Sequence, residues 1–266
     1  MLEFSNHLPL PTMLEGIRKS LELSLLQSFN ITPQYRKTSL TESKFSGFPY
    51  LPKLWSFPKD LDGNPMIFLA QINFSECQSF PPFPRKGILQ FFVSKSLTCY
   101  VINEDIFQHY FKVRYFPTIL PEEEIITNFA DFPICPSVEH PIQNEMAISF
   151  KKKLEPVSAM DYRIKNYINE EEFQLQLEDG RTLEEYYFEN FLGAEHKIGG
   201  YPYFIHKDSR KDSNLLKRYD TLLLQIVSDD EQGIMWGDSG IIKFFINKEK
   251  LSQGDFTDIY FHAEQY

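Results

Sequence analysis

Two segments of the chain carry apolar residues at helical spacing. In the first, Thr12 stands where a helix N-cap is expected, and the apolar positions that follow recur three or four residues apart, at Leu14, Ile17, Leu21 and Leu25. In the second, Thr182 and Glu185 form the capping-box pattern, and Gly193 stands where a helix would stop. The apolar stripe of this second segment comprises Leu183, Tyr187 and Phe191. The pattern predicts one helix in each segment.

Four short apolar runs predict buried strands. "MIFLAQINF" (66–74) and "TLLLQIVS" (221–228) are almost entirely apolar, and each carries a single glutamine. "GILQFFVS" (87–94) and "GIIKFFIN" (240–247) begin with glycine and are rich in β-branched and aromatic residues. None of the runs reaches the roughly 18 residues that a membrane-spanning helix needs.

Three pairs of short sequences recur in the same order along the chain. "KFSGFPY" (44–50) matches "KIGGYPY" (197–203), "LAQI" (69–72) matches "LLQI" (223–226), and "GILQFFV" (87–93) matches "GIIKFFI" (240–246). The offset is 153 or 154 positions in every pair. Gly47 and Gly200 in the first pair would allow backbone angles that other residues resist. A constant offset of this kind predicts an internal duplication.

The predicted fold class is α+β, as a single compact domain over residues 1–266 with a mostly antiparallel sheet. Each repeat would be a helix–turn–strand–loop–strand unit, over approximately residues 10–93 and 182–246. The intervening insert, residues 94–181, has no counterpart, although runs such as "TCYVIN", "FKVRYF" and "MAISFKKKLEPVS" suggest further strands or short helices. A pseudo-twofold packing of the two units is an inference from the repeat.

Composition and charge describe an ordinary globular protein. The chain has 266 residues, 42% hydrophobic and 24% charged, with a formal net charge of −10. The net negative charge weighs against nucleic-acid binding, because the best candidate for a basic patch, Lys151–Lys153, has only three lysines. The cysteines, Cys77, Cys99 and Cys135, are widely spaced, which favours reduced thiols. The first residues lack a signal-peptide pattern, so we expect a cytoplasmic protein that binds no membrane.

The sequence "WGDSG" (236–240) contains the surroundings of a serine-protease nucleophile, which raises the question of whether Ser239 is reactive. A serine needs an adjacent base and a group that orients the base, and none of the six histidines stands in a recognisable triad setting. Asp238 and Ser239 are better explained as turn residues that lead into a strand. We therefore predict no catalytic serine.

Metal and cofactor sites have little sequence support. Asp229, Asp230 and Glu231 precede a glycine but lack the spacing of a calcium-binding loop. The chain has no Cys/His cluster for zinc and no glycine-rich phosphate loop. We expect no cofactor and no metal.

The whole chain resembles the bacterial YwqG-like family, a family of unknown function. The resemblance rests on "GGYPY", "LLLQI", "WGDSG", "FFINKEKLSQGDF" and, in the first half, "FPYLPKLWSFP". It implies a cytoplasmic bacterial protein, and for members found beside secreted toxins an immunity or other protein-binding role. Many relatives have alanine in place of Ser239, which also argues against a nucleophile.

The aromatic, glycine- and proline-rich turns remain as a candidate site. If the units pack about a pseudo-twofold axis, the two turns would flank a cleft, or their aromatic residues would simply fill the two half-cores. The ligand-binding candidates are Lys44, Tyr50, Trp55, Tyr203 and Trp236. The leading hypothesis is a non-catalytic protein- or ligand-binding domain, with a toxin as one candidate partner. The alternative is a hydrolase-like enzyme that uses Asp238 as acid or base, with His196 and Lys197 as helpers.

Overall fold

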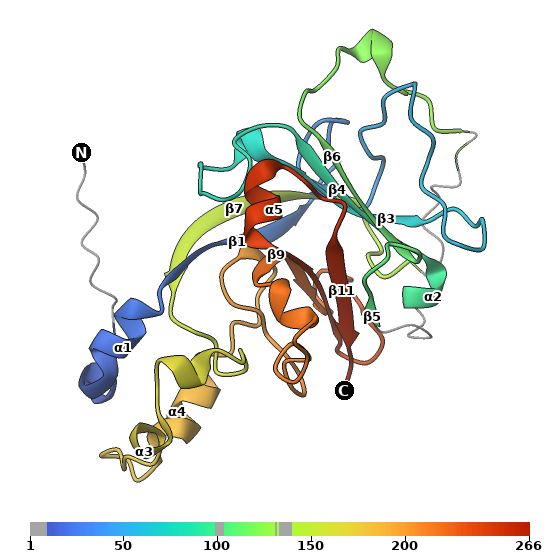
Figure 1. Cartoon of the computed structure of the whole chain (residues 1–266). Helices are drawn as coiled ribbons and strands as arrows, with labels where there is room; N and C mark the ends of the chain where they lie inside the picture. The colour runs from blue at the N-terminus through green and yellow to red at the C-terminus, as the bar shows by residue number, and fades with distance from the viewer. Residues whose placement is uncertain (1–9, 99–103, 131, 133–139) are drawn as a thin grey trace.

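The computed structural model describes residues 10–98, 104–130, 132 and 140–266 (Figure 1). Their strands form one antiparallel sheet in the order β5-β11-β10-β9-β8-β1-β7-β2-β3-β4-β6. The strands are β1 (Leu26–Tyr35), β2 (Lys44–Phe45), β3 (Ile67–Asn73), β4 (Ile88–Val93), β5 (Glu104–Asp105), β6 (Phe111–Phe116), β7 (Met146–Glu155), β8 (Lys197–Gly199), β9 (Thr221–Val227), β10 (Ile241–Ile246) and β11 (Ile259–Glu264). The prediction of a single compact domain with a mostly antiparallel sheet is confirmed.

Helices are few and short. The α-helices are α1 (Arg18–Leu23), α2 (Lys95–Thr98), α3 (Glu170–Phe173), α4 (Leu183–Asn190) and α5 (Lys248–Gln253). The 3-10 helices are η1 (Thr12–Ile17), η2 (Phe74–Glu76), η3 (Glu122–Glu124), η4 (Ile164–Asn166) and η5 (Leu216–Arg218). In the part of the chain that the structure describes, no helix is long and apolar enough to cross a membrane.

The long strands β1 and β7 form the centre of the sheet. They pair antiparallel over ten residues, from Leu26 opposite Glu155 to Tyr35 opposite Met146. β8 pairs with the other edge of β1, and β2 with the other edge of β7. We call β2, β3, β4 and β6 with their loops the first half, and β8 to β11 with their loops the second half. The three pairs of matched sequences take corresponding places in the two halves: β2 and β8 next to the centre, then β3 and β9, then β4 and β10.

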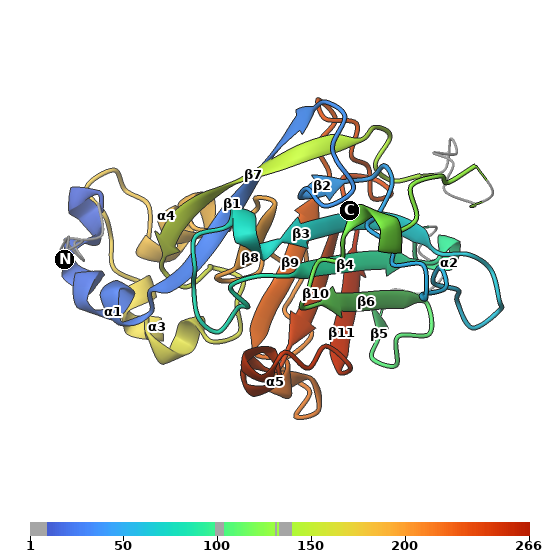
Figure 2. The ribbon, with the colours of Figure 1, turned by 90° about the horizontal axis from the view of Figure 1, so that it is seen from above.

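The two halves face each other across the main hydrophobic core. Figure 2 shows the strands β3, β4 and β6 running across β9, β10 and β11. Phenylalanine rings of the two halves pack against each other. The ring centroids of Phe91 in β4 and Phe244 in β10 lie 4.9 Å apart, and those of Phe111 in β6 and Phe261 in β11 lie 5.7 Å apart. Aromatic pairs of this kind add to the free energy gained from burial of their area. The two halves of the sheet therefore pack face to face around this core.

The helices α1 and α4 lie in a separate corner, next to the ends of β1 and β7 (Figure 1). Leu14, Ile17 and Leu21 pack there against Leu183 and Tyr187, so the predicted apolar stripes meet in one cluster. The capping box of Thr182 and Glu185 is confirmed. The predicted cap at Thr12 is wrong, because Pro11 is the N-cap residue and Thr12 already belongs to a 3-10 turn.

The strand β1 was missed by the sequence prediction, which placed the turn directly after the first helix. The end of β1 is polar and exposed at Gln34 and Tyr35, and Pro33 has no backbone N–H to donate to a neighbouring strand. The sequence of this segment therefore shows only a weak strand pattern. The predicted insert, residues 94–181, supplies β5, β6 and the central strand β7. Parts of "TCYVIN", as well as Cys99 and Cys135, lie outside the described residues, whereas Cys77 is a free thiol.

Candidate functional site

A buried glutamine holds the first matched turn. Gln71 of β3 accepts a hydrogen bond from the Tyr50 peptide N–H at 2.8 Å and donates to the carbonyls of Leu40 and Glu42 at 2.9 Å. Gln90 of β4 donates to the Tyr50 carbonyl at 2.6 Å and to Gln71 Oε1 at 2.8 Å. Both glutamines are fully buried. Their amides therefore satisfy the turn backbone, which would otherwise be unpaired inside the protein.

The second matched turn is held in the same way. Gln225 of β9 accepts from the Tyr203 peptide N–H at 2.8 Å and donates to the carbonyls of Gly193 and Glu195 at 2.9 and 2.8 Å. Lys243 of β10, which stands in the place of Gln90, donates to the Tyr203 carbonyl at 3.0 Å. The two turns share one hydrogen-bonding pattern, and residues at matching sequence positions supply it.

Two of the candidate ligand-binding residues lie inside the core. Tyr50 is fully buried, its hydroxyl accepts from the Leu120 N–H at 2.9 Å, and its ring packs edge-on against Phe116. Trp236 is also buried within the main core, and its peptide N–H donates to Ser228 Oγ at 3.0 Å. These contacts are typical of core packing.

The other three candidates lie at different depths. Lys44 is fully buried and donates to the carbonyls of Ser39 at 2.5 Å and Phe48 at 3.0 Å. Tyr203 is half-buried, with its hydroxyl 3.1 Å from that of Tyr266. Trp55 is half exposed and lies beneath the guanidinium of Arg114. Trp55 presents the most side-chain surface of the five.

Asp238 is an exposed residue of the turn before β10. Its backbone carbonyl accepts from the Tyr266 N–H at 3.2 Å, and its carboxylate forms no hydrogen bond or ion pair with any residue that the structure describes. Ser239 is exposed too, with φ 49°, in the left-handed region. The Gly240 N–H donates to the Trp236 carbonyl at 2.8 Å and closes the turn. The geometry is that of a turn leading into a strand.

His196 and Lys197 are buried and have other partners than Asp238. His196 Nδ1 accepts from the Val227 N–H at 3.2 Å, and Nε2 lies 3.9 Å from Asp229. Burial lowers the pKa of His196 to about 4, although Asp229 opposes the shift, so the ring is neutral at pH 7. Lys197 pairs with Glu155 at 3.0 Å. The structure therefore does not bring the three catalytic candidates together as one constellation.

A cavity of about 290 Å³ lies between the two halves of the sheet. The first half contributes Phe80 and Phe83, whose rings stack at 4.3 Å, together with Pro81 and Pro82. The remaining wall comes from β1, the second half and the segment before α3: Leu26, Gln27, Arg163, Gly199, Gly200, Asp220, Thr221 and Lys248. We call it the interhalf cavity. A cleft between the units was expected, but none of the eight predicted site residues lines this one.

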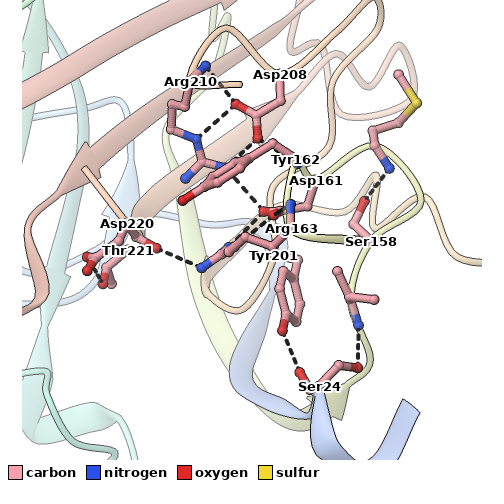
Figure 3. A network of polar contacts seen from close by, with 12 residues as sticks. Ser24, Ser158, Asp161, Tyr162, Arg163, Tyr201, Asp208, Arg210, Asp220 and Thr221 are labelled. Carbon is pink, nitrogen blue, oxygen red and sulfur yellow. Dashed lines mark hydrogen bonds and ion pairs between the residues drawn. The ribbon is translucent and has the colours of Figure 1, made fainter. Parts of the chain in front are cut away.

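Arg163 is the fixed charge of the interhalf cavity. Its Nε and Nη2 donate to the two oxygens of Asp161, both at 2.7 Å, and its Nη1 donates to the Asp220 carbonyl at 3.1 Å (Figure 3). Burial by itself would raise the pKa of Asp161, but Arg163 and Arg210 outweigh it and hold that pKa below its ordinary value. Asp161 thus stays ionised and locks the guanidinium in place.

A second arginine, Arg210, also donates a hydrogen bond to Asp161. Arg210 is fully buried, donates to both oxygens of Asp208 at 2.9 and 2.7 Å, and reaches Asp161 at 3.1 Å (Figure 3). Asp161, Arg163, Asp208 and Arg210 form a chain of alternating charges. Buried charges persist in proteins where they are paired and hydrogen-bonded in this manner.

The interhalf cavity is lined by free donors and by one partly occupied carboxylate, that of Asp220. Arg163 uses three of its five guanidinium N–H groups on described partners, and Gln27 Nε2 is buried without a described partner. The Lys248 side chain is exposed and makes no ion pair with a described residue. Asp220 Oδ1 accepts from the Thr221 hydroxyl and the Lys248 peptide N–H at 2.9 Å each, whereas Oδ2 has no partner among the described residues. The polar wall therefore suits a ligand rich in acceptors.

Sequence reasoning missed Arg163, Gln27 and Lys248. Asp161 and Arg163 stand in "MDYRIK", which looks like a solvated charged segment when it is considered alone. The available signal was a second Asp-x-Arg triplet: "DYR" (161–163) and "DSR" (208–210) each form the same two-point aspartate–arginine contact. Their mutual contact depends on tertiary packing, which local pattern does not reveal.

Comparisons with other proteins give a family without an assigned activity. Among the residues that the structure describes, no group of three His, Cys, Asp or Glu side chains is placed to hold a metal ion. No curated protein matches the chain. Residues 43–264, which include both halves of the sheet, match the model of a domain of unknown function, DUF1963. The chain therefore belongs to the DUF1963 family.

Proposed function

We propose that this protein is a non-catalytic binding domain whose ligand is a small organic anion held in the interhalf cavity. The carrying observation is that three residues with side-chain donors, Arg163, Gln27 and Lys248, line the same cavity as Phe80, Phe83 and two prolines. Ligand sites are commonly apolar clefts between structural units with a few convergent polar groups. An aromatic or aliphatic carboxylate, with its apolar part against Phe80 and Phe83, fits this arrangement.

The carboxylate of the ligand would lie on Arg163. A planar guanidinium that is fixed by Asp161 loses little conformational entropy when it forms further charge-assisted hydrogen bonds. Lys248 would add a solvent-exposed positive charge near the entrance. Its contribution would be smaller and would weaken at high salt, because exposed charges are screened.

The proposal of binding rather than catalysis draws on the separate positions of Asp238, His196 and Lys197. A general base must reach the proton that it removes, and Asp238 has no described partner that could tune or orient it. Ser239 has no described base beside it. The hydrolase-like alternative around Asp238 therefore has no geometric support.

Calorimetric titration with benzoate and with its neutral isostere benzamide tests this function. We expect benzoate to bind about tenfold more tightly, because benzoate presents two anionic acceptor oxygens to the Arg163 guanidinium, whereas benzamide presents one neutral acceptor oxygen. Lys248→Ala should weaken benzoate binding about threefold at low salt, whereas Lys217→Ala, an exposed lysine away from the cavity wall, should leave it unchanged. Equal binding of benzoate and benzamide, or no binding of either, would refute the proposed site.

A protein partner is a second candidate, favoured by one exposed surface. Leu54 is 98% exposed and Trp55 50% exposed, and Arg114 lies over the Trp55 ring at 5.4 Å. Tryptophan and arginine dominate protein-interface energetics. If the chain is an immunity-type protein of the bacterial cytoplasm, as its resemblance to the YwqG-like family suggests, its toxin would dock here. The double variant Leu54→Asp/Trp55→Ala should weaken such a complex at least about tenfold, and Leu175→Asp, in the helical corner, should not.

We also propose an internal duplication, which is consistent with a binding site between the two halves of the sheet. The matched turns, glutamines and strands take corresponding places on either side of β1 and β7. The interhalf cavity is lined by residues of both proposed repeats and by Arg163 and Lys248, which lie outside them.

A further inference from the structure

A second cavity, of about 370 Å³, lies between the end of α4 and strand β8. Its charged and aromatic wall consists of Lys153, Glu155, Phe191, Glu195, Lys197 and Tyr201. It shares no lining residue with the interhalf cavity. We call it the Lys197 cavity.

Two polar atoms at the base of the Lys197 cavity lack a full set of hydrogen bonds. Lys197 is fully buried, and its Nζ donates to Glu155 Oε1 at 3.0 Å as its one hydrogen bond to a described residue. Lys44, which occupies the matching position in the first half, makes two such bonds to backbone carbonyls. Glu195 Oε2 is buried, lies 3.8 Å from Lys197 Nζ and accepts no hydrogen bond from a described residue. A donor and an acceptor thus stand side by side without a common partner.

A hydroxyl group satisfies both atoms at once. It can accept from the Lys197 ammonium and donate to the Glu195 carboxylate, whereas an ammonium has no lone pair to accept with and a carboxylate has no proton to donate. A single water would also do so, but a water needs only about 10–15 Å³ of such a cavity. The remaining space has the size for a molecule of several heavy atoms.

The charges around the cavity balance, which argues for a neutral ligand. Lys153 contacts Glu195 at 2.8 Å and Glu155 at 3.9 Å, so two lysines face two glutamates. Burial alone would raise the pKa of Glu195, but Lys197 and Lys153 outweigh it and keep that pKa below its ordinary value. Glu195 therefore remains an ionised acceptor, and a charged ligand would meet as much repulsion as attraction.

We propose that the Lys197 cavity is a second binding site, for a neutral hydroxylated molecule such as a monosaccharide. One hydroxyl bridges Lys197 Nζ and Glu195 Oε2, and the sugar ring lies toward Phe191 and Tyr201. The site is independent of the organic-anion site, and its ligand differs in charge.

Amide-resolved NMR titration of the whole protein with D-glucose and D-ribose tests the site, with zwitterionic L-alanine and anionic acetate as the probes that carry formal charges. We expect one of the two sugars to shift amides of residues 153–158 and 190–201, and the charged probes to leave them unmoved. Glu195→Ala should weaken the affinity about five- to tenfold through loss of one charge-assisted hydrogen bond, and Glu184→Ala, an exposed glutamate on α4, should not change it.

Equal unfolding temperatures of the two variants would show that Glu195→Ala removes a contact and leaves the fold intact. Glu195→Gln provides a second variant that keeps an acceptor oxygen, and it should bind more tightly than Glu195→Ala. The proposal is overturned if neither sugar shifts these amides at saturating concentrations, if L-alanine or acetate binds as well as the sugars, or if Glu195→Ala binds like the unmodified protein. Benzoate binding in the interhalf cavity is read separately and does not depend on any of these outcomes.

Discussion

Gln71 and Gln225 make the same three hydrogen bonds on opposite sides of the β1–β7 pair. Each amide oxygen accepts from the N–H of a turn tyrosine at 2.8 Å, and each amide nitrogen donates to two carbonyls of the preceding segment. In each half, one buried side chain thus connects a core strand to the glycine–proline turn. The sequence matches around these two turns therefore have a structural reason in both halves.

Replacement of either glutamine should be costly. Gln225→Ala leaves one N–H and two carbonyls unpaired in the interior, so we expect the free energy of unfolding to fall by about 2–4 kcal/mol, and Gln71→Ala should act similarly. Gln34→Ala, at an exposed position of β1, should change it by less than about 0.5 kcal/mol. Urea denaturation measures the difference. A loss below about 1 kcal/mol for both buried variants would contradict the role assigned to these amides.

The buried arginine network should be equally sensitive. Asp208→Asn leaves the Arg210 guanidinium, which has no exposed surface, with half of its charge compensation, so we expect a loss of about 3–5 kcal/mol. The exposed pair of Lys207 and Asp212, at 3.2 Å, is the matched control, and Asp212→Asn should cost less than about 1 kcal/mol. Thermal or urea unfolding of the two variants distinguishes them. Similar losses in both would mean that burial does not set the energetics of the network.

A comparison of Gly200 with Gly180 distinguishes the cost of backbone strain from the cost of a steric clash. The φ of Gly200 is +69°, and an added Cβ would lie 1.9 Å from Glu155 Oε1 and 2.8 Å from Ser28 Cβ. Gly180 has φ +86° with open space around it. We expect Gly180→Ala to cost about 1 kcal/mol, from backbone strain alone, and Gly200→Ala about 2–4 kcal/mol, since Glu155 must also move. Equal costs would show that the turn yields easily.

Three buried histidines should make the protein sensitive to acid. Burial lowers the pKa of His140 and His196 from 6.5 to about 4 and that of His262 well below 6.5. Between pH 6.5 and 4 the unfolded chain therefore binds more protons than the folded one, so stability is full above pH 6.5 and falls as the pH decreases toward 4. Each of the first two contributes up to about 3 kcal/mol.

Denaturant titrations at a series of pH values measure this dependence. His196→Gln should flatten the slope between pH 6.5 and 4, while His109→Gln, at an exposed position, should leave the slope unchanged. A slope that is independent of both substitutions would assign the acid sensitivity to carboxylates instead.

Much of the fold could be predicted from local pattern. The four apolar runs became β3, β4, β9 and β10, and the Thr182 capping box began α4 as expected. These features are encoded within a few residues of one another. The sequence analysis missed β1 because β1 pairs with β7, which connects residues 26–35 with residues 146–155. A local hydrophobic pattern gives no information about a partner so distant in sequence.

The site was harder to predict, for the same physical reason. Lys44, Tyr50 and Trp236 stand in distinctive turns, and distinctive sequence here reflects packing and hydrogen bonding in the core. Arg163 and Lys248 stand in unremarkable charged segments, and only the folded chain brings them to one cavity with Gln27. Among the original candidates, Lys197 lines a cavity, and its role depends on the neighbouring Glu195, which no motif indicated.

The most direct test of the central claim is a crystal structure of the protein with bound 4-bromobenzoate, whose bromine is located by its anomalous signal. We expect bromine density beside Phe80 and Phe83 in the interhalf cavity, with the carboxylate within hydrogen-bond distance of Arg163. Bromine density elsewhere, or an interhalf cavity without density at a saturating concentration of the probe, would contradict the central claim.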